Sequence, residues 1–344
     1  MIHIDGSYGE GGGQILRSSI ALSSLLGEPI RIDNIRVNRP KPGLAQQHLT
    51  GIEAMQRLTD AEIKGLKLGS TEVEFSPSSL HGGSYSIDIG TAGSISLVLQ
   101  VVSLPCAFTD SAVELNIIGG TDVAWSPPID YMKEVFYPSI SKMGCRTNLE
   151  ILKRGYYPRG GGRVNVRISP MKRLMPLDLT ERGKFLKVMG VAHSLNLPEH
   201  IVKREAKAAK RVLKDYSCHI SLEYGRGTST GTGIVLWAFF ENSILCASSL
   251  GKPGKPAEKV GEEAARSLLN EIEANASIDL HLGDQIIPYL ALAEGESRIF
   301  VGELTNHLKT NIYVVEKILN TKFKILTHER GYTITVDGIG FEKR

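Results

Sequence analysis

The chain alternates between stretches whose apolar residues recur at helical spacing and stretches whose apolar residues recur at every second position. The first 90 residues predict one unit in the order strand, helix, strand, helix, strand, strand. This unit opens with a short apolar strand and a turn crowded with glycine, and Gly27 marks the end of its first helix. Its later elements are a helix over 14–26, a strand over 30–37, a helix over 44–58 and strands near 71–75 and 84–89.

The same order recurs loosely in two later parts of the chain, which is the pattern of a repeated supersecondary unit. We therefore expect an α+β or α/β fold whose large domain, residues 1–180 and 276–344, contains three helix-on-four-stranded-sheet units. The second copy is predicted from helices over 92–104 and 127–143 and strands over 112–118, 146–152 and 163–168. The third is predicted from a helix starting at Asp284, a helix over 311–319, and strands near 297–301, 322–327 and 331–336.

Residues 181–275 interrupt this rhythm and predict a smaller inserted α/β domain. Its elements are strands over 185–193, 217–224, 233–240 and 244–250, and helices over 198–215 and 256–274. The first of these helices carries lysines on one face, which favours a solvated surface over a stripe that follows an RNA backbone. These lysines are Lys203, Lys207, Lys210 and Lys214.

Composition places the chain among ordinary globular proteins, with 344 residues, 42% hydrophobic and 22% charged residues, and a net charge of +3. The charge is too small to indicate a nucleic-acid partner by itself. The four cysteines form no CxxC pair, so reduced buried thiols are expected rather than a zinc site. No signal peptide and no apolar run long enough to cross a bilayer is present, so we expect a cytoplasmic protein without membrane contact.

The glycine-rich stretch over 4–17 is the first candidate site. Its glycines allow positive φ angles and let a ligand approach bare backbone N–H groups at the start of the next helix. Glu10 lies in the turn, and Arg17 lies in the helix, where a guanidinium can bind phosphate with two parallel hydrogen bonds. The alternative is a tight turn that binds nothing.

Two more stretches carry polar residues suited to phosphate or nucleotide chemistry. Arg36, Arg39 and Lys41 precede Gln47 and His48 at the start of a helix, which suits a terminal phosphate, unless the loop is simply solvated. His307 precedes Thr310, the expected N-cap of the last helix, whose positive end favours a neutral, nucleophilic imidazole. A hydrogen-bonded surface histidine is the alternative.

Residues 281–285, His-Leu-Gly-Asp-Gln, form a further candidate. Asp284 and Gln285 suit recognition of ribose hydroxyls or a base edge, or Asp284 serves as the N-cap of its helix. The chain contains no GxxxxGK[ST] phosphate loop and no kinase or GxSxG signature, and its glycine turn fits a Rossmann fingerprint poorly.

Together these segments resemble the RNA 3′-terminal phosphate cyclase family over nearly the whole chain. Gly283 departs from the family, which usually has alanine there, and the family has histidine or tyrosine at the position of His281. The blocks that carry the resemblance are DGSYGEGGGQILR at 5–17, RVNRPKPGLAQQHL at 36–49, GTAGSISLVLQ at 90–100, GGTDVAWSPP at 119–128, RGYYPRGGGRV at 154–164, HLGDQ at 281–285 and TNHLKTNIYVVE at 305–316.

The resemblance implies a fold and an activity. The fold has three repeats, each similar to the C-terminal domain of a bacterial translation initiation factor, and a smaller inserted domain with a thioredoxin-like arrangement. The activity is that of a ligase that uses ATP and Mg²⁺ or Mn²⁺ to convert an RNA 3′-phosphate end into a 2′,3′-cyclic phosphate. It proceeds by nucleotidyl transfer through a covalent histidine–AMP and an RNA–adenylate anhydride.

The resemblance also implies roles for single residues. His307 corresponds to the histidine that attacks the α-phosphorus of ATP, and Glu10 to a metal-associated carboxylate. The residues implied in the ATP pocket are Gln100, Pro128, His281, Leu282, Gly283, Asp284 and Gln285. Those implied around the phosphates and the RNA end are Arg17, Arg36, Arg39, Gln47 and His48.

Two other protein classes share related folds. Cyclase-like proteins that act in ribosome assembly lack the nucleophilic histidine, so the presence of His307 together with Glu10 and Arg17 disfavours that class. Enolpyruvyl transferases act on small anionic sugars or acids and do not need the RGYYPRGGGRV block, which makes that class less consistent with this sequence.

Overall fold

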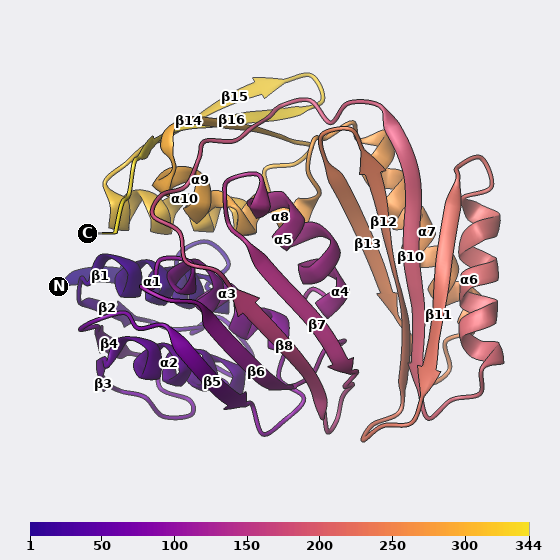
Figure 1. Cartoon of the computed structure of the whole chain (residues 1–344), viewed down its shortest axis with the longest axis horizontal. Coiled ribbons are helices and arrows are strands. Elements are labelled where there is room, and N and C mark those ends of the chain that lie inside the picture. The colour runs from indigo at the N-terminus through magenta and orange to yellow at the C-terminus, as the bar shows by residue number, and fades with distance from the viewer. Residues whose placement is uncertain (344) are drawn as a thin grey trace.

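The computed structural model describes residues 1–343 and contains four four-stranded sheets within them (Figure 1). The first sheet has the order β1 (Ile2–Asp5), β2 (Ile30–Asp33), β4 (Val73–Ser76) and β3 (Glu62–Lys64), with helices α1 (Gly13–Leu26) and α2 (Gln46–Thr59). The helix predicted over 14–26 is confirmed, and Gly27 ends it at φ 70°. Strand β3 was not predicted, because it is short and largely exposed.

The second sheet has the order β5 (Gly83–Asp88), β6 (Val113–Gly119), β8 (Gly162–Ile168) and β7 (Thr147–Lys153). The strand predicted near 84–89 exists as β5, but its assignment to the first unit is wrong, because β5 pairs with β6. Helix α3 (Ile95–Cys106) crosses between those two strands. A continuous helical segment connects β6 to β7 and consists of α4 (Ile129–Tyr131), the π-helical turn η1 (Met132–Phe136) and α5 (Tyr137–Ser141).

The third sheet has the order β9 (Asp178–Leu179), β14 (Glu294–Val301), β16 (Gly331–Ile339) and β15 (Phe323–His328). Its helices are α8 (Leu280–Gln285), α9 (Ile287–Leu292) and α10 (Asn306–Leu319). In each of these three sheets the strands lie in the order first, second, fourth, third along the chain. In each, the first two strands are parallel and the other pairs antiparallel.

Two predicted helix starts in the third unit are wrong. Asp279, not Asp284, is the N-cap of α8, because its carboxylate accepts hydrogen bonds from the backbone N–H groups of His281 and Leu282. Thr305, not Thr310, is the N-cap of α10, and its hydroxyl accepts from the N–H of Leu308 at 3.1 Å. The earlier start of α10 places His307 inside the first helical turn.

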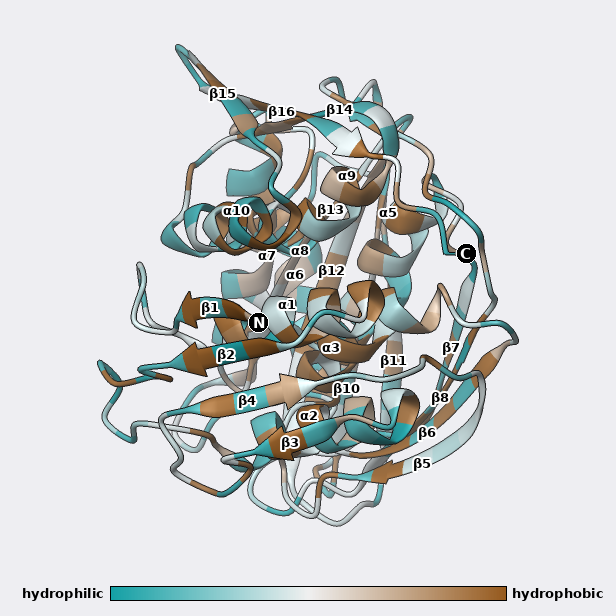
Figure 2. Ribbon diagram, turned by 90° about the vertical axis from the view of Figure 1, so that its left-hand side faces the viewer, coloured by the Kyte–Doolittle hydropathy of each residue, from teal (hydrophilic) through white to brown (hydrophobic). Residues whose placement is uncertain are grey.

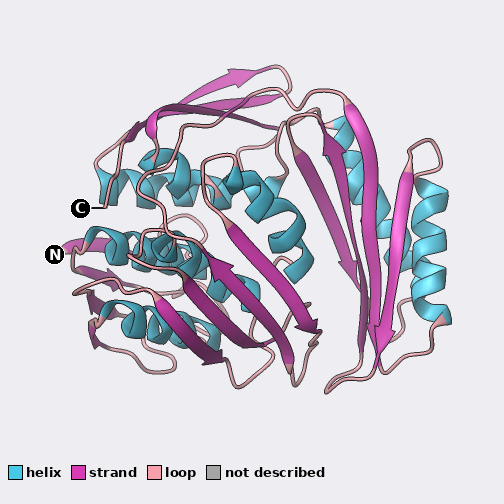
Figure 3. Ribbon diagram, in the orientation of Figure 1, coloured by secondary structure: helices cyan, strands magenta, loops and turns pink. Residues whose placement is uncertain are grey.

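The fourth sheet lies within residues 181–275 and has the order β11 (Cys218–Gly225), β10 (Phe185–Leu195), β12 (Gly231–Phe240) and β13 (Ile244–Leu250). Figure 3 shows helices α6 (His200–Val212) and α7 (Ala257–Glu273) along one side of this sheet. They cover a separate apolar core built on Val202, Ala264 and Leu268. The opposite face of the sheet joins the large core through Val191, Val235, Trp237 and Cys246.

Helix α1 lies at the centre of the larger part of the molecule. It packs against α2, α3 and α10, so elements from all three related sheets meet around it. Figure 2 shows hydrophobic stretches in the helices that lie between the sheets, as expected for amphipathic helices that share a core. Within residues 1–343, no helix combines the length and the apolar character that crossing a bilayer requires.

Candidate active site

A cavity of about 330 Å³ opens beside the N-terminal half of α1. Its walls come from α1, α3, η1, α8, α9 and α10, and from the loop that precedes α4, so helices connected to all three sheets with the common strand order contribute. The lining includes apolar side chains as well as polar and charged ones. The lining residues are Gln14, Arg17, Ser18, Ala21, Leu97, Gln100, Leu104, Trp125, Ser126, Pro127, Phe136, His281, Asp284, Gln285, Pro288, Tyr289, His307 and Asn311.

His307 is held from two sides in the first turn of α10. Its Nδ1 lies 2.5 Å from Oε1 of Gln14, and its Nε2 lies 3.2 Å from a carboxylate oxygen of Glu10. Gln14 in turn donates through Nε2 to Oδ2 of Asp284 at 3.1 Å. Gln14 of α1 therefore links His307 of α10 to Asp284 of α8 by hydrogen bonds, and Glu10 of the glycine-rich turn lies within ion-pair distance of the other ring nitrogen.

These hydrogen bonds assign the proton on the His307 ring. The Gln14 amide nitrogen donates to Oδ2 of Asp284, and the amide oxygen faces His307 and accepts from it. Nδ1 of His307 consequently carries the proton, and Nε2 keeps its lone pair. Burial lowers the pKa of His307 below 6.5, and nearby Arg17 and Arg39 lower it further, although Glu10 acts in the opposite direction. At neutral pH the imidazole is therefore an uncharged base and nucleophile.

Arg17 and Asp284 are two charged groups that line the cavity. Burial raises the pKa of Asp284 to about 7, although Arg17 and the Gln14 hydrogen bond favour its ionised form. Burial also lowers the pKa of Arg17 to about 10, which leaves the guanidinium charged at neutral pH. Oδ1 of Asp284 and Oε1 of Gln285 are buried without a hydrogen-bond partner among residues 1–343. Both atoms are acceptors available to a ligand that brings hydrogen-bond donors.

The glycine-rich turn packs on α10 and brings Glu10 next to His307. Gly9 and Gly11 have φ angles of 58° and 56°, which confirms that this turn uses the left-handed conformations that glycine permits. The ring of Tyr8 stacks on that of Tyr313 with centroids 3.7 Å apart, which fixes the turn against the helix. Glu10 pairs with Arg39 at 3.2 Å, so the basic loop reaches the same place.

Comparison with known proteins gives one consistent result. The sequence model of the family described as "RNA 3′-terminal phosphate cyclase" matches residues 8–325. The chain belongs to the RNA 3′-terminal phosphate cyclase family. A protein of that name from Pyrobaculum aerophilum is 47% identical over 346 residues and 99% of each chain. Another from Methanococcoides burtonii is 50% identical over 327 residues, which cover 94% of this chain and 96% of the relative. The expected membership is thereby confirmed.

The residues that the cyclase family implies at the phosphate end occupy different positions. Arg36 donates to the carbonyl oxygen of Gly43 at 2.7 Å and so braces the basic loop. Gln47 accepts from the N–H of Ser94 and links α2 to the start of α3. His48 is buried against Gly13, and its Nδ1 accepts from the N–H of Ala45 at 3.0 Å. Burial lowers the pKa of His48 to about 3, so its ring is neutral.

The residues implied at the nucleotide end also divide into two groups. Gln100, His281, Asp284 and Gln285 line the cavity. Leu282 and Gly283 face the core beside the third sheet instead, where Leu282 is completely buried and Gly283 lies next to Val301 of β14. Pro128 is the N-cap of α4, and the neighbouring Pro127 lines the cavity in its place.

Sequence reasoning missed Gln14 and Asn311, which organise the cyclase-family cavity. Asn311 is buried in α10, where Oδ1 accepts from the Ser18 hydroxyl at 2.5 Å and Nδ2 donates to the carbonyl oxygen of Asp284. Both residues stand at positions where the helix pattern calls for an apolar side chain. A polar residue on a predicted apolar face is the signal that would have indicated them.

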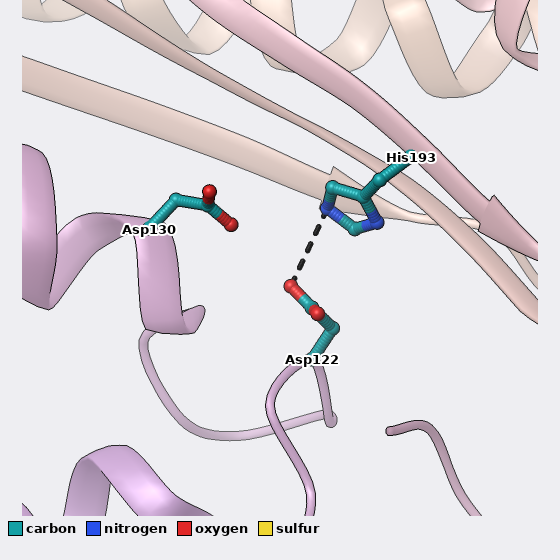
Figure 4. Close-up of side chains that lie close together, drawn as sticks. All are labelled: Asp122, Asp130 and His193. Atoms are coloured by element: carbon teal, nitrogen blue, oxygen red, sulfur yellow. Dashed lines mark ion pairs between the residues drawn. The ribbon is translucent and has the colours of Figure 1, made fainter. Parts of the chain in front are cut away.

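A second polar cluster lies outside the cavity, where the inserted segment meets the second sheet. Figure 4 shows Asp122, Asp130 and His193 side by side, and all three are buried. Carboxylates and a histidine in this arrangement resemble a metal site. However, the buried guanidinium of Arg154 already contacts both carboxylates, binding Asp130 through two nitrogens at 2.7 and 3.0 Å. Arg154 supplies the positive charge, so this cluster does not fit a divalent cation.

Proposed function

We propose that this protein uses ATP to convert the 3′-terminal phosphate of RNA into a 2′,3′-cyclic phosphate, with His307 as the residue that carries AMP. The observation that supports this most directly is the hydrogen bond from Nδ1 of His307 to Gln14, which assigns the ring proton to Nδ1 and leaves Nε2, 3.2 Å from a Glu10 oxygen, as the nucleophilic nitrogen. The names of the relatives, which are RNA 3′-terminal phosphate cyclases, agree with this chemistry.

In the first step, Nε2 of His307 attacks the α-phosphorus of ATP and pyrophosphate leaves. In the second, an oxygen of the RNA 3′-phosphate attacks the same phosphorus, which forms an RNA–adenylate anhydride and restores the imidazole. In the third, the neighbouring 2′-hydroxyl attacks the terminal RNA phosphorus, loses its proton and expels AMP. Adenylation supplies the leaving group that a phosphate monoester lacks, and the attacking hydroxyl is already adjacent.

The cavity suits a nucleotide in two respects. Its apolar wall, which includes Leu97, Leu104 and Phe136, provides a surface for a purine ring. The free acceptor oxygens of Asp284 and Gln285 suit the hydroxyl and amino donors of a nucleoside. Arg17 lines the same cavity as His307, and its positive charge would offset that of the phosphates.

We further propose that Glu10 contributes to a Mg²⁺ or Mn²⁺ site. Such ions in nucleotide enzymes are commonly held by one or two carboxylates together with phosphate oxygens and water. Glu10 is a partly exposed carboxylate beside His307, and its present partner Arg39 is exposed enough to move aside. A bound divalent ion would offset the negative charge of the triphosphate.

The three sheets with one common strand order support three copies of a single unit, formed by residues 1–180 and 276–344. We propose that residues 181–275 are a domain inserted into the third copy, between β9 and α8. Their separate apolar core under α6 and α7 supports this division. The parallel and antiparallel pairings of that sheet are compatible with a thioredoxin-like arrangement.

Incubation with ATP labelled at the α-phosphorus tests the proposal. The wild-type protein should retain label after denaturation, and His307→Ala should not. His328→Ala is a matched control, because His328 lies in the distant strand β15 and hydrogen bonds only locally, to Thr333. An oligonucleotide with a 3′-phosphate should then yield a 2′,3′-cyclic end. RNA binding without protein labelling or cyclic product would favour a non-catalytic member of the family.

A further inference from the structure

Trp125 is an unusual residue on the surface of this molecule. Its side chain is 100% exposed, whereas the other tryptophan of the chain, Trp237, is only 8% exposed. Tyr8, an exposed aromatic ring two residues before Glu10, differs in that it stacks on Tyr313. No aromatic or cationic partner of Trp125 lies within the described residues 1–343. A large apolar ring in water without a partner suggests a binding role.

The loop that carries Trp125 is fixed at both of its ends. At its start, the Asp122 carboxylate is buried and bonded to Arg154, and the N–H of Thr121 donates to the carbonyl oxygen of Gly155. At its end, the carbonyl oxygen of Pro127 accepts from the hydroxyl of Ser96 at 2.8 Å. The ring of Trp125 is therefore mounted on an anchored loop rather than on a free tail.

The backbone at Trp125 is in the left-handed region, with φ at 67°. A bulky residue rarely adopts this conformation, and such strain tends to occur at functional sites. Here it turns the side chain outward, away from the core. The ring is thus held in a solvent-exposed position that neither core packing nor backbone preference accounts for.

Trp125 lines the same cavity as His307 and Arg17. The apolar lining residues of that cavity, such as Leu97 and Phe136, are suited to the purine of ATP. Because the Trp125 ring lines the cavity and is fully exposed, it is suited to contact a substrate that extends from the cavity into solvent. On the proposed function, that substrate is the RNA, whose terminal phosphate must reach the phosphorus held at His307.

We propose that Trp125 is the stacking platform for the 3′-terminal nucleobase of the RNA substrate, a subsite at the solvent-exposed edge of the cavity. This inference rests on the proposed function, because it assigns the second substrate of that reaction. Stacking on an aromatic ring is tolerant of base identity, since each base presents a π-face. The subsite would therefore position RNA ends of any sequence, while the arginines bind the terminal phosphate.

Acrylamide quenching of tryptophan fluorescence tests binding without any turnover. Because Trp237 is buried, the accessible emission comes from Trp125, and Trp125→Phe should abolish it. A short oligonucleotide with a 3′-phosphate should protect Trp125 from acrylamide in the absence of ATP. The same oligonucleotide lacking its terminal base should not protect. Equal protection by both oligonucleotides, or protection by ATP alone with none by RNA, would overturn the proposal.

Kinetics provide a second, independent test. Trp125→Ala should lower kcat/KM for the 3′-phosphorylated oligonucleotide about tenfold, equivalent to about 1.4 kcal/mol, and Trp125→Phe should restore most of it. Wild type and Trp125→Ala should act equally on the oligonucleotide without a terminal base. Tyr224→Ala, an exposed aromatic on β11 outside the cavity, is the matched control.

The formation of protein–AMP separates this proposal from the function on which it rests. If Trp125→Ala slows protein–AMP formation from ATP as strongly as it slows RNA cyclisation, the ring serves ATP and the proposal is refuted. If the wild type forms no protein–AMP, the proposed function fails, and the quenching experiment still decides whether Trp125 contacts the RNA base.

Discussion

Gln14 offers the sharpest test of how the structure prepares His307. Its amide accepts from Nδ1 of His307 at 2.5 Å and donates to Asp284 at 3.1 Å, so one side chain both orients the ring and fixes its tautomer. Gln14→Met keeps the length and lack of branching of the side chain and removes both hydrogen bonds. We expect slower formation of protein–AMP, because Nε2 is no longer held unprotonated toward the cavity.

The magnitude follows from the two hydrogen bonds. Each contributes about 1 kcal/mol, and water can replace part of the contact to His307 because that ring is half-exposed. A loss of about 1–2 kcal/mol in transition-state stabilisation corresponds to a rate about 5–30-fold lower. Single-turnover transfer of label from ATP to protein measures this rate directly.

Gln56→Met is the matched control, because Gln56 in α2 makes one local hydrogen bond, to the carbonyl oxygen of Ala61. It should leave the labelling rate unchanged. Urea unfolding of both variants would separate a loss of stability from a loss of chemistry. A labelling rate within about twofold of wild type for a folded Gln14→Met protein would refute the assigned tautomer and its role.

Three further predictions concern pH, stability and the glycine turn. Because the pKa of His307 lies below 6.5, protonation of its ring should reduce the rate of labelling by ATP only at pH values under 6.5. Arg39→Ala removes a nearby positive charge and should move this decrease to higher pH, and an unmoved pH profile would contradict the assignment. Arg154→Met should reduce the free energy of unfolding by about 3–5 kcal/mol in urea titrations, because it leaves buried carboxylates unpaired; a loss under about 1 kcal/mol would be inconsistent. Gly13→Ala should slow labelling by up to about 100-fold, because a Cβ at this position would clash with the His48 ring and lie 3.1 Å from Arg17. A normal labelling rate would show that His48 and Arg17 can shift without affecting the reaction.

The sequence predicted the elements well where local pattern determines them. Alternating apolar residues located most strands, and Gly27 located the end of α1. The sequence prediction failed where strand pairing between distant residues determines which sheet a strand joins. No local feature of residues 83–88 indicates that they pair with 113–118. It also failed at helix starts, because several polar residues near each start were plausible caps and only the backbone geometry distinguishes Thr305 from Thr310.

The candidate site was predictable in part for a similar reason. Glycine, arginine and histidine are conspicuous in sequence, so Glu10, Arg17 and His307 were identified from type and spacing. Gln14 and Asn311 were not, because each acts through partners more than 25 residues away in the chain. A buried amide has no local signature beyond its place on an apolar helix face.

The polar cluster around Arg154 ties two parts of the chain together in a way that affects any attempt to shorten the protein. His193 of strand β10 lies 3.3 Å from Asp122, and its Nδ1 lies 2.5 Å from the hydroxyl of Tyr156. Asp122 anchors the loop that forms one wall of the cavity. Excision of residues 181–275 would therefore remove the His193 contacts that support this wall. A shortened enzyme would lose the shape of its cavity as well as the excised residues.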